Sequence, residues 1–145
     1  NTYNTADITV TLAHELGHYL GLHHVFSETE NENSCKDTDY CADTPTYNKK
    51  AYDMDCAYIE VNDPDNFTFA NLVNRENCLT GESFVSYNIM DYAISYSDRF
   101  TPEQRARIRH VLLYSPLIPG PKAGQEAGTR SAPSGLMELP IRTAK

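Results

Sequence analysis

A short run near the start of the chain combines residue types and spacings that suit metal chemistry: His14-Glu15-Leu16-Gly17-His18-Tyr19-Leu20-Gly21-Leu22-His23-His24. Residues four apart lie on one face of a helix, so His14 and His18 can present two imidazoles to one ion. Gly21 accepts left-handed dihedrals that cost other residues, so the chain can leave the helix there and His24 can return as a third ligand. Three protein ligands with an open fourth position are the arrangement of catalytic zinc.

Glu15 supplies the group that hydrolytic chemistry needs beside such a metal. It directly follows the first ligand, so it lies next to the ion, where it can hydrogen-bond a water and act as general base. The five positions would coincide about once in three million random starts if residues were equiprobable. A histidine-rich amphipathic helix without a metal is the alternative. His23 is expected to face solvent or pack, and His110 to lie at the surface.

A helix must carry the first two histidines. The spacing predicts one over about residues 5–20, with Thr5 or Asp7 as its N-cap and Gly21 as its stop. An apolar stripe at helical spacing supports this helix and is formed by Leu12, Leu16, Tyr19 and Leu20.

A second helix is predicted late in the chain. The run Thr101-Pro102-Glu103-Gln104 is a capping box with proline at the first helical position, and the helix is expected to end near Tyr114. Its buried face is expected to comprise Ile108, Val111 and Leu112. Before it, a short segment of apolar and polar residues from Phe84 leads into a turn over residues 88–92.

Residues 27–81 form a long polar stretch with few periodic apolar positions, which predicts an irregular loop. Such a loop is uncommon in a compact domain unless it is cross-linked or metal-bound. All four cysteines lie in it, and their three pairings stay open: Cys35, Cys41, Cys56 and Cys78. No C-x-x-C pair favours zinc ligation, so disulfides in an exported protein are the preferred interpretation over metal-binding thiols.

Composition limits the class of protein. At 145 residues the chain is long enough for one domain with a real core. The mean hydropathy is −0.54, and no apolar run approaches the roughly 20 residues of a membrane span. The net charge of −8 disfavours nucleic acid as a partner and suits a protein that binds cations, although a solvated acidic surface explains the same charge.

The two ends of the chain differ from its middle. No initiator methionine or signal peptide precedes the first helix, so we expect a fragment or a processed chain. From Ser115 onward Pro and Gly recur without periodicity, and residues 125–134 suggest a flexible linker or tail. We therefore divide the chain into residues 1–115, which carry the motif and both helices, and a C-terminal extension over residues 116–145.

Several segments together resemble one group of zinc endopeptidases. The extended histidine motif followed by a methionine in a tight turn is similar to the metzincin clan. Three further segments narrow the resemblance to the pappalysin family: Asp43-Thr44-Pro45, Asn88-Ile89-Met90-Asp91-Tyr92 and Phe100-Thr101-Pro102-Glu103-Gln104. The resemblance covers about residues 7–114. It implies an α+β, metzincin-like fold that is mostly helical and irregular in this chain, in a secreted or cell-surface protein.

The resemblance also implies a role for each matching residue. Glu15 would be the general base and acid of peptide-bond hydrolysis. Met90 would be the Met-turn residue, an apolar floor beneath the metal, with ordinary core packing as a compatible alternative. Tyr92 would stabilise the oxyanion, with a surface tyrosine as the alternative. The ligands of one Zn²⁺ would be His14, His18 and His24.

Two structural features are implied in the same way. Family members bind structural calcium after the motif helix, where oxygen donors suited to Ca²⁺ are offered by Asp37, Asp39, Asp43 and Thr44. Turn-making and capping by these aspartates is the alternative. In the family a cysteine soon after the motif pairs with one shortly before the Met-turn, which implies Cys35–Cys78 here and leaves Cys41–Cys56.

Metzincins place a twisted sheet upstream of the motif helix, and its edge strand holds the extended peptide substrate. No such sequence precedes residue 1, so we expect this chain to lack the upper sheet subdomain and to pair with it within one precursor. A zinc endopeptidase acting on peptides or proteins is the leading hypothesis. A non-catalytic zinc-binding or interaction module, or an inactive fragment, is the alternative. A non-metzincin zinc protease with a downstream glutamate as third ligand is a third.

Overall fold

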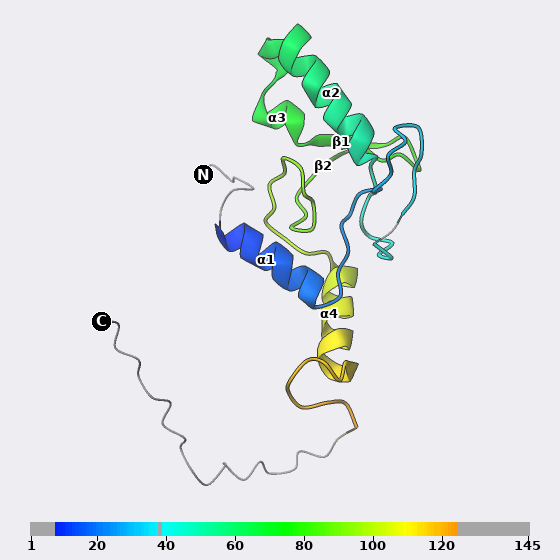
Figure 1. Cartoon of the computed structure of the whole chain (residues 1–145), viewed down its shortest axis with the longest axis vertical. Helices are drawn as coiled ribbons and strands as arrows, with labels where there is room; N and C mark the ends of the chain where they lie inside the picture. Colours follow the sequence, from blue (N-terminus) through cyan, green and yellow to red (C-terminus); the bar gives the residue numbers. More distant parts are fainter. Residues whose placement is uncertain (1–7, 38, 125–145) are drawn as a thin grey trace, which may run out of the picture.

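The computed structural model describes residues 8–37 and 39–124. Over these residues the chain combines helices with a small sheet, as the α+β expectation requires. α2 and α3 lie at one end of the molecule, α4 at the other, and α1 and the strands between them (Figure 1). In chain order the elements are α1 (Ile8–Tyr19), α2 (Lys49–Asn62), the 3₁₀ helix η1 (Pro64–Asn66), α3 (Phe69–Leu72), β1 (Asn74–Glu76), β2 (Ser83–Val85) and α4 (Pro102–Tyr114).

The C-terminal end of α1 has the geometry that the sequence predicts. Gly21 has a φ of 85°. Its N–H bonds the carbonyl of His18, and the N–H of Leu22 bonds that of Gly17, both at 2.9 Å, which is the Schellman pattern. A Cβ at residue 21 would lie 2.9 Å from Cγ2 of Val111, so glycine also permits the contact with α4. The predicted N-cap, Thr5 or Asp7, lies outside the described residues.

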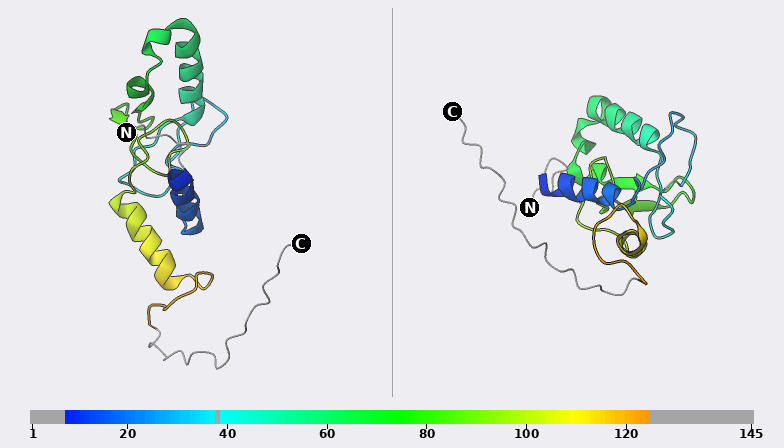
Figure 2. Two further views of the ribbon diagram at one scale, coloured as in Figure 1. Left: turned by 90° about the vertical axis from the view of Figure 1, so that its left-hand side faces the viewer. Right: turned by 60° about the horizontal axis from the view of Figure 1, so that its bottom comes forward.

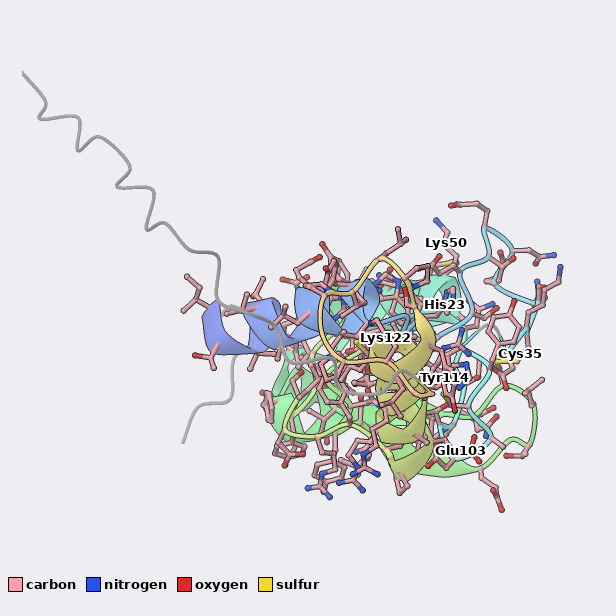
Figure 3. All side chains as sticks on the ribbon, turned by 90° about the horizontal axis from the view of Figure 1, so that it is seen from below. His23, Cys35, Lys50, Glu103, Tyr114 and Lys122 are labelled. Atoms are coloured by element: carbon pink, nitrogen blue, oxygen red, sulfur yellow. A yellow bond between two sulfur atoms is a disulfide. The ribbon has the colours of Figure 1, made fainter. Side chains whose placement is uncertain are left out.

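The apolar stripe of α1 faces outward. Leu12, Leu16 and Tyr19 are 58%, 48% and 59% exposed, and Ile8 is 82% exposed. The first turns of α1 project past the rest of the described chain (Figure 3). Such a stripe normally covers a core, whereas the buried residues of α1 are His14 and Gly17. The helix therefore turns its histidine face, and not its leucine face, towards the body of the chain.

A small apolar core joins three parts of the chain. Leu22 and Val25 follow α1 and are buried together with Met90, and Phe100 and Ile108 pack against them. Ile108 belongs to α4, which Figure 2 shows beside the end of α1. The core therefore fixes the end of the histidine helix against the turn that contains Met90.

α4 begins and ends where the sequence predicts. Thr101 Oγ1 accepts a hydrogen bond from the N–H of Gln104, and the Gln104 side chain accepts one from the N–H of Thr101, which completes the capping box. The predicted buried face is right in part. Ile108 packs on the core, but Leu112 is exposed.

The prediction of an irregular loop over residues 27–81 is wrong, because this stretch contains α2, η1, α3 and β1. Asn48 is the N-cap of α2, and its side chain accepts a hydrogen bond from the N–H of Ala51. None of the α2 residues is fully buried. Ala51, Tyr52, Cys56 and Ile59 are half-buried on one side, but exposed apolar residues lie on the other sides as well, so the apolar periodicity that would indicate a helix is weak.

The disulfide that the family resemblance implies is present, and the pairing left over from it is not. Cys35 and Cys78 form a disulfide that spans 43 residues, with Cα atoms 5.7 Å apart. The second pairing, Cys41 with Cys56, is wrong, because both are free thiols. Cys56 lies in α2, whereas Cys41 is buried beside the start of α4, where burial raises the pKa of its thiol to about 11.

The described part of the predicted extension folds back on α4. The N–H of Ala123 bonds the carbonyl of Leu113, and Lys122 Nζ bonds that of Leu112. The boundary at residue 115 stays a prediction, and the predicted linker over residues 125–134 lies outside the described residues. None of the described helices is long and apolar enough to cross a membrane.

Candidate metal centre

Three histidine side chains converge on one point. The Nε2 atoms of His14 and His18 lie 3.0 Å apart, and that of His24 lies 3.3 Å from the first and 3.2 Å from the second. No other three His, Cys, Asp or Glu side chains gather in this way among residues 8–37 and 39–124. α1 supplies two of the rings, and the Schellman turn at Gly21 brings back the third.

The opposite ring nitrogens all have oxygen partners. Nδ1 of His14 bonds the carbonyl of Ile89 at 2.8 Å, and Nδ1 of His18 bonds the carbonyl of Leu22 at 3.0 Å. Nδ1 of His24 contacts a carboxylate oxygen of Glu28. Because an oxygen acceptor places the proton on Nδ1, each Nε2 keeps a lone pair, and the three lone pairs point at one another.

This arrangement fits a zinc ion. Tetrahedral zinc with Zn–N bonds of about 2.0–2.1 Å places ligand nitrogens roughly 3.3–3.4 Å apart, close to the observed spacings. Burial lowers the pKa of His14, and the neighbouring His18 and His24 lower it further, against the raising effect of the bond to Ile89. A lowered pKa favours the neutral imidazole, which is the form that binds metal.

Met90 packs against α1 beside the histidine cluster. It is 0% exposed, and its N–H donates to Oδ1 of Asn88. The Met90 sulfur lies under Gly17, which sits between the two helical ligands, and a Cβ at residue 17 would come within 2.5 Å of it. This role of Gly17 is not among the predictions made from the sequence, although a glycine in a helix interior, unfavourable by about 1 kcal/mol, is a signal of close packing.

Gly17→Ala should destabilise the protein by about 1–3 kcal/mol, because the new methyl group must displace the fully buried Met90 side chain. The measurement is the denaturant midpoint of unfolding. Ala13→Gly, one turn earlier in α1, is the control and should lose only about 1 kcal/mol from helix propensity. A Gly17→Ala protein as stable as the native one would contradict the close contact.

Glu15 and Tyr92 are exposed side chains near the cluster. Glu15 is exposed on α1, next to His14, and its charge acts on that imidazole. Tyr92 is 67% exposed, and its ring centre lies 6.2 Å from that of His14 and 6.0 Å from that of His24. His23 and His110 are exposed, as predicted, and stand outside the cluster.

A buried polar network that the sequence does not predict supports the turn around Met90. Oδ1 of Asp91 accepts hydrogen bonds from the Tyr47 hydroxyl at 2.6 Å and from the N–H of Ala93 at 3.1 Å. Its other oxygen accepts from the Ser86 hydroxyl and lies 3.5 Å from Nη2 of Arg75. Burial raises the pKa of Tyr47 far above its usual range, so the phenol remains a donor.

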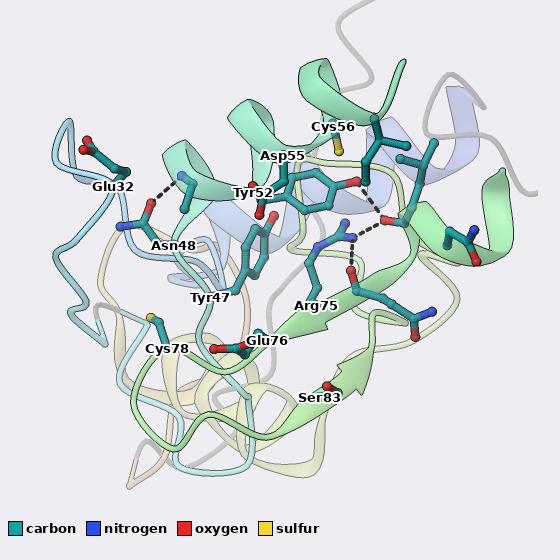
Figure 4. A pocket seen from close by; sticks show the side chains of 15 residues that line it. Glu32, Tyr47, Asn48, Tyr52, Asp55, Cys56, Arg75, Glu76, Cys78 and Ser83 are labelled. Atoms are coloured by element: carbon teal, nitrogen blue, oxygen red, sulfur yellow. Dashed lines mark hydrogen bonds between the residues drawn. The ribbon is translucent and has the colours of Figure 1, made fainter. Parts of the chain in front are cut away.

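Arg75 brings the positive charge of this network. It is the one buried residue of β1, and its guanidinium donates to backbone carbonyls while it lies between two tyrosines. Its Cζ is 3.8 Å from the ring centre of Tyr52 and 4.9 Å from that of Tyr47 (Figure 4). The network therefore connects the sheet to the residue between Met90 and Tyr92.

The aspartates proposed as calcium ligands have turn and capping roles. Asp39 accepts hydrogen bonds from the N–H of Cys41 and the hydroxyl of Thr44, and Asp37 accepts one from the N–H of Asp39. Asp43 accepts from the N–H of Glu103 at the start of α4. Burial raises the pKa of Asp39 to about 6. The calcium site stays a prediction.

A hollow of about 630 Å³ opens beside His24 and Tyr92. The loop after His24 and the first turn of α2 line it, and Lys49 pairs there with Asp53 at 2.5 Å. Lys49 Nζ lies 6.0 Å from the ring centre of Tyr92. The hollow therefore lies next to the histidine cluster and opens to solvent.

The model of peptidase family M43, described as pregnancy-associated plasma protein-A, matches residues 1–113. The chain belongs to family M43. This confirms the resemblance to the pappalysins. No solved structure matches the M43 chain.

Curated relatives of the M43 chain carry a common name. "Extracellular metalloprotease" describes proteins of Arthroderma benhamiae and Trichophyton verrucosum that are 36% identical to it over 99 residues, and one of Arthroderma otae that is 35% identical over 99 residues. Each match covers 68% of the M43 chain and 29% of the relative, so the chain spans less than a third of these proteins. M43 is a peptidase family, and these relatives are named metalloproteases.

Proposed function

We propose that the chain carries the zinc-binding and catalytic centre of an endopeptidase that hydrolyses peptide bonds. The observation that carries this proposal is the convergence of three Nε2 atoms, which lie 3.0–3.3 Å from one another. Each Nδ1 of the same rings already has an oxygen partner. Glu15 beside the cluster adds a base that a purely structural zinc site does not need.

When bound, zinc would supply Lewis acidity, which lowers the pKa of a water towards neutrality and polarises a carbonyl. His14, His18 and His24 would hold the ion. Glu15, exposed next to His14, takes the proton of the attacking water and returns it to the leaving amine. The Tyr92 phenol, exposed near the cluster, donates a hydrogen bond to the oxyanion. Met90 and Asp91 act indirectly, because they fix the turn that presents Tyr92.

A non-catalytic zinc-binding or interaction module is the second candidate. The observation that favours it is the exposed apolar face of α1, formed by Ile8, Leu12, Leu16 and Tyr19, because such faces commonly contact another protein surface. The two candidates differ in what they require of Glu15. A binding module has no use for a base beside the metal, whereas the peptidase requires it.

Metal removal separates the two candidates. We expect the intact protein to bind one zinc per chain and to cleave fluorescein-labelled casein, to lose cleavage in a chelator, and to regain it with one equivalent of Zn²⁺. Metal content and fluorescence release are measured on the same sample. One bound zinc without cleavage would favour the module, and cleavage that persists without metal would refute the proposed function.

The wider assignments also belong to this proposal. The relatives are named extracellular, and Cys35–Cys78 is a disulfide of the kind that persists in oxidising compartments, so we infer secretion. The substrate would be a peptide or protein. It would bind between this chain and an upper sheet subdomain of the same precursor.

A further inference from the structure

The three histidines of the cluster differ in what holds their outer nitrogens. His14 and His18 donate to backbone carbonyls, which remain whatever the side chains are. His24 contacts a carboxylate oxygen of Glu28, four residues later. His24 is therefore the one ligand of the cluster whose orientation depends on a replaceable side chain.

His24 also has the weakest backbone support of the three. α1 carries the other two ligands, whereas His24 follows the Schellman turn and lies outside any helix or strand. The ring of Phe26 stacks on it at 4.7 Å with planes 14° apart. Stacking restrains rotation of the imidazole about the Cβ–Cγ bond, but a change in χ1 can still slide the ring across the face of Phe26. A partner at Nδ1 is needed to stop that movement and keep Nε2 aimed at the other two.

The chain presents Glu28 to this nitrogen from a fixed anchor. The preceding residue, Ser27, is buried, and its N–H bonds the carbonyl of Tyr47 at 2.8 Å. The Glu28 side chain itself is 59% exposed and fills no part of the core. The contact with His24 is therefore the main interaction of the Glu28 side chain, and a smaller side chain at residue 28 would leave no cavity.

We propose that Glu28 is a positioning residue of the metal centre that orients His24 and strengthens it as a ligand. This inference rests on the proposed zinc site. A carboxylate on the outer nitrogen fixes the tautomer and raises the basicity of a metal-binding imidazole. Because the acceptor is charged, this bond is stronger than the carbonyl bonds of the other two rings.

The test compares zinc affinity in four forms of the intact protein: native, Glu28→Ala, Glu28→Gln and Glu30→Ala. Glu30 is the matched control, because it lines the same hollow with the same charge. Competition with a chromophoric chelator measures the dissociation constant. Glu28→Ala should weaken zinc binding about 10–100-fold. Glu28→Gln, which keeps an oxygen acceptor, should lose less, and Glu30→Ala should match the native protein.

Two further readouts identify the cause. With Co²⁺ in place of zinc, Glu28→Ala should shift the visible absorption bands, because the geometry of one ligand changes, and Glu30→Ala should not. Thermal unfolding of the metal-free proteins should be the same for the native and Glu28→Ala forms.

Unchanged zinc affinity in Glu28→Ala, an equal loss in Glu30→Ala, or a metal-free Glu28→Ala protein that unfolds earlier would overturn the role of Glu28. None of these results affects the proposed function, which requires that the native protein bind zinc and cleave peptides but does not depend on Glu28. A native protein that binds no zinc would refute the proposed function itself.

Discussion

Glu15→Gln should lower peptide cleavage about 10²–10⁴-fold while zinc binding stays stoichiometric. Glutamine has the size of glutamate but cannot take a proton from the attacking water, so the step that forms the tetrahedral intermediate loses its base. Glu15 is exposed and makes no buried contact, so the variant should fold as the native protein does. The measurement is the initial rate on labelled casein, normalised to zinc content.

Glu60→Gln is the control for loss of one surface carboxylate, because Glu60 is exposed on α2 and outside the histidine cluster. It should keep native activity. If Glu15→Gln cleaved casein as fast as Glu60→Gln, the assigned base would be wrong, although the zinc site could stand.

Arg75→Met should destabilise the protein by about 3–5 kcal/mol, because it leaves the buried carboxylate of Asp91 without its positive partner. The Arg75 and Asp91 side chains are both 0% exposed. The hydroxyls of Tyr47 and Ser86 still donate to the carboxylate, but they carry no charge. The free energy of unfolding in urea, measured with excess zinc, reports the loss.

A surface ion pair provides the comparison. Arg99 pairs with Asp98 at 2.5 Å, but the Arg99 side chain is 61% exposed, so Arg99→Met should leave the free energy of unfolding nearly unchanged. Equal losses in Arg75→Met and Arg99→Met would show that the buried network does not hold the turn around Met90. Asp91→Asn should reduce the loss caused by Arg75→Met, because the unpaired charge is then absent.

The parts of the structure that the sequence predicts are those with local signals. Gly21 and the capping box of α4 act within one helical turn, so their residue types reveal them. The histidine cluster follows from helical spacing plus one turn. α2 escapes prediction because its apolar residues lie on several sides of the helix and none is fully buried, so the sequence shows only weak helical periodicity.

The supports of the site depend on contacts between distant segments. Arg75 reaches Asp91 across 16 residues, and Tyr47 reaches it across 44. Their residue types alone do not indicate partners. The disulfide also joins distant segments. The spacing of the cysteines leaves three pairings open, and it is the family resemblance that implies Cys35–Cys78. Glu28 is four residues from His24, but outside a helix that spacing predicts no contact.

X-ray absorption at the zinc edge of the intact protein tests the central claim most directly. We expect one zinc bound by three imidazole nitrogens and one oxygen, all at about 2.0–2.2 Å. The spectrum of His24→Ala should show one imidazole fewer. A sulfur ligand at about 2.3 Å, which would point to the free thiols of Cys41 or Cys56, or a spectrum unchanged by His24→Ala, would contradict this claim.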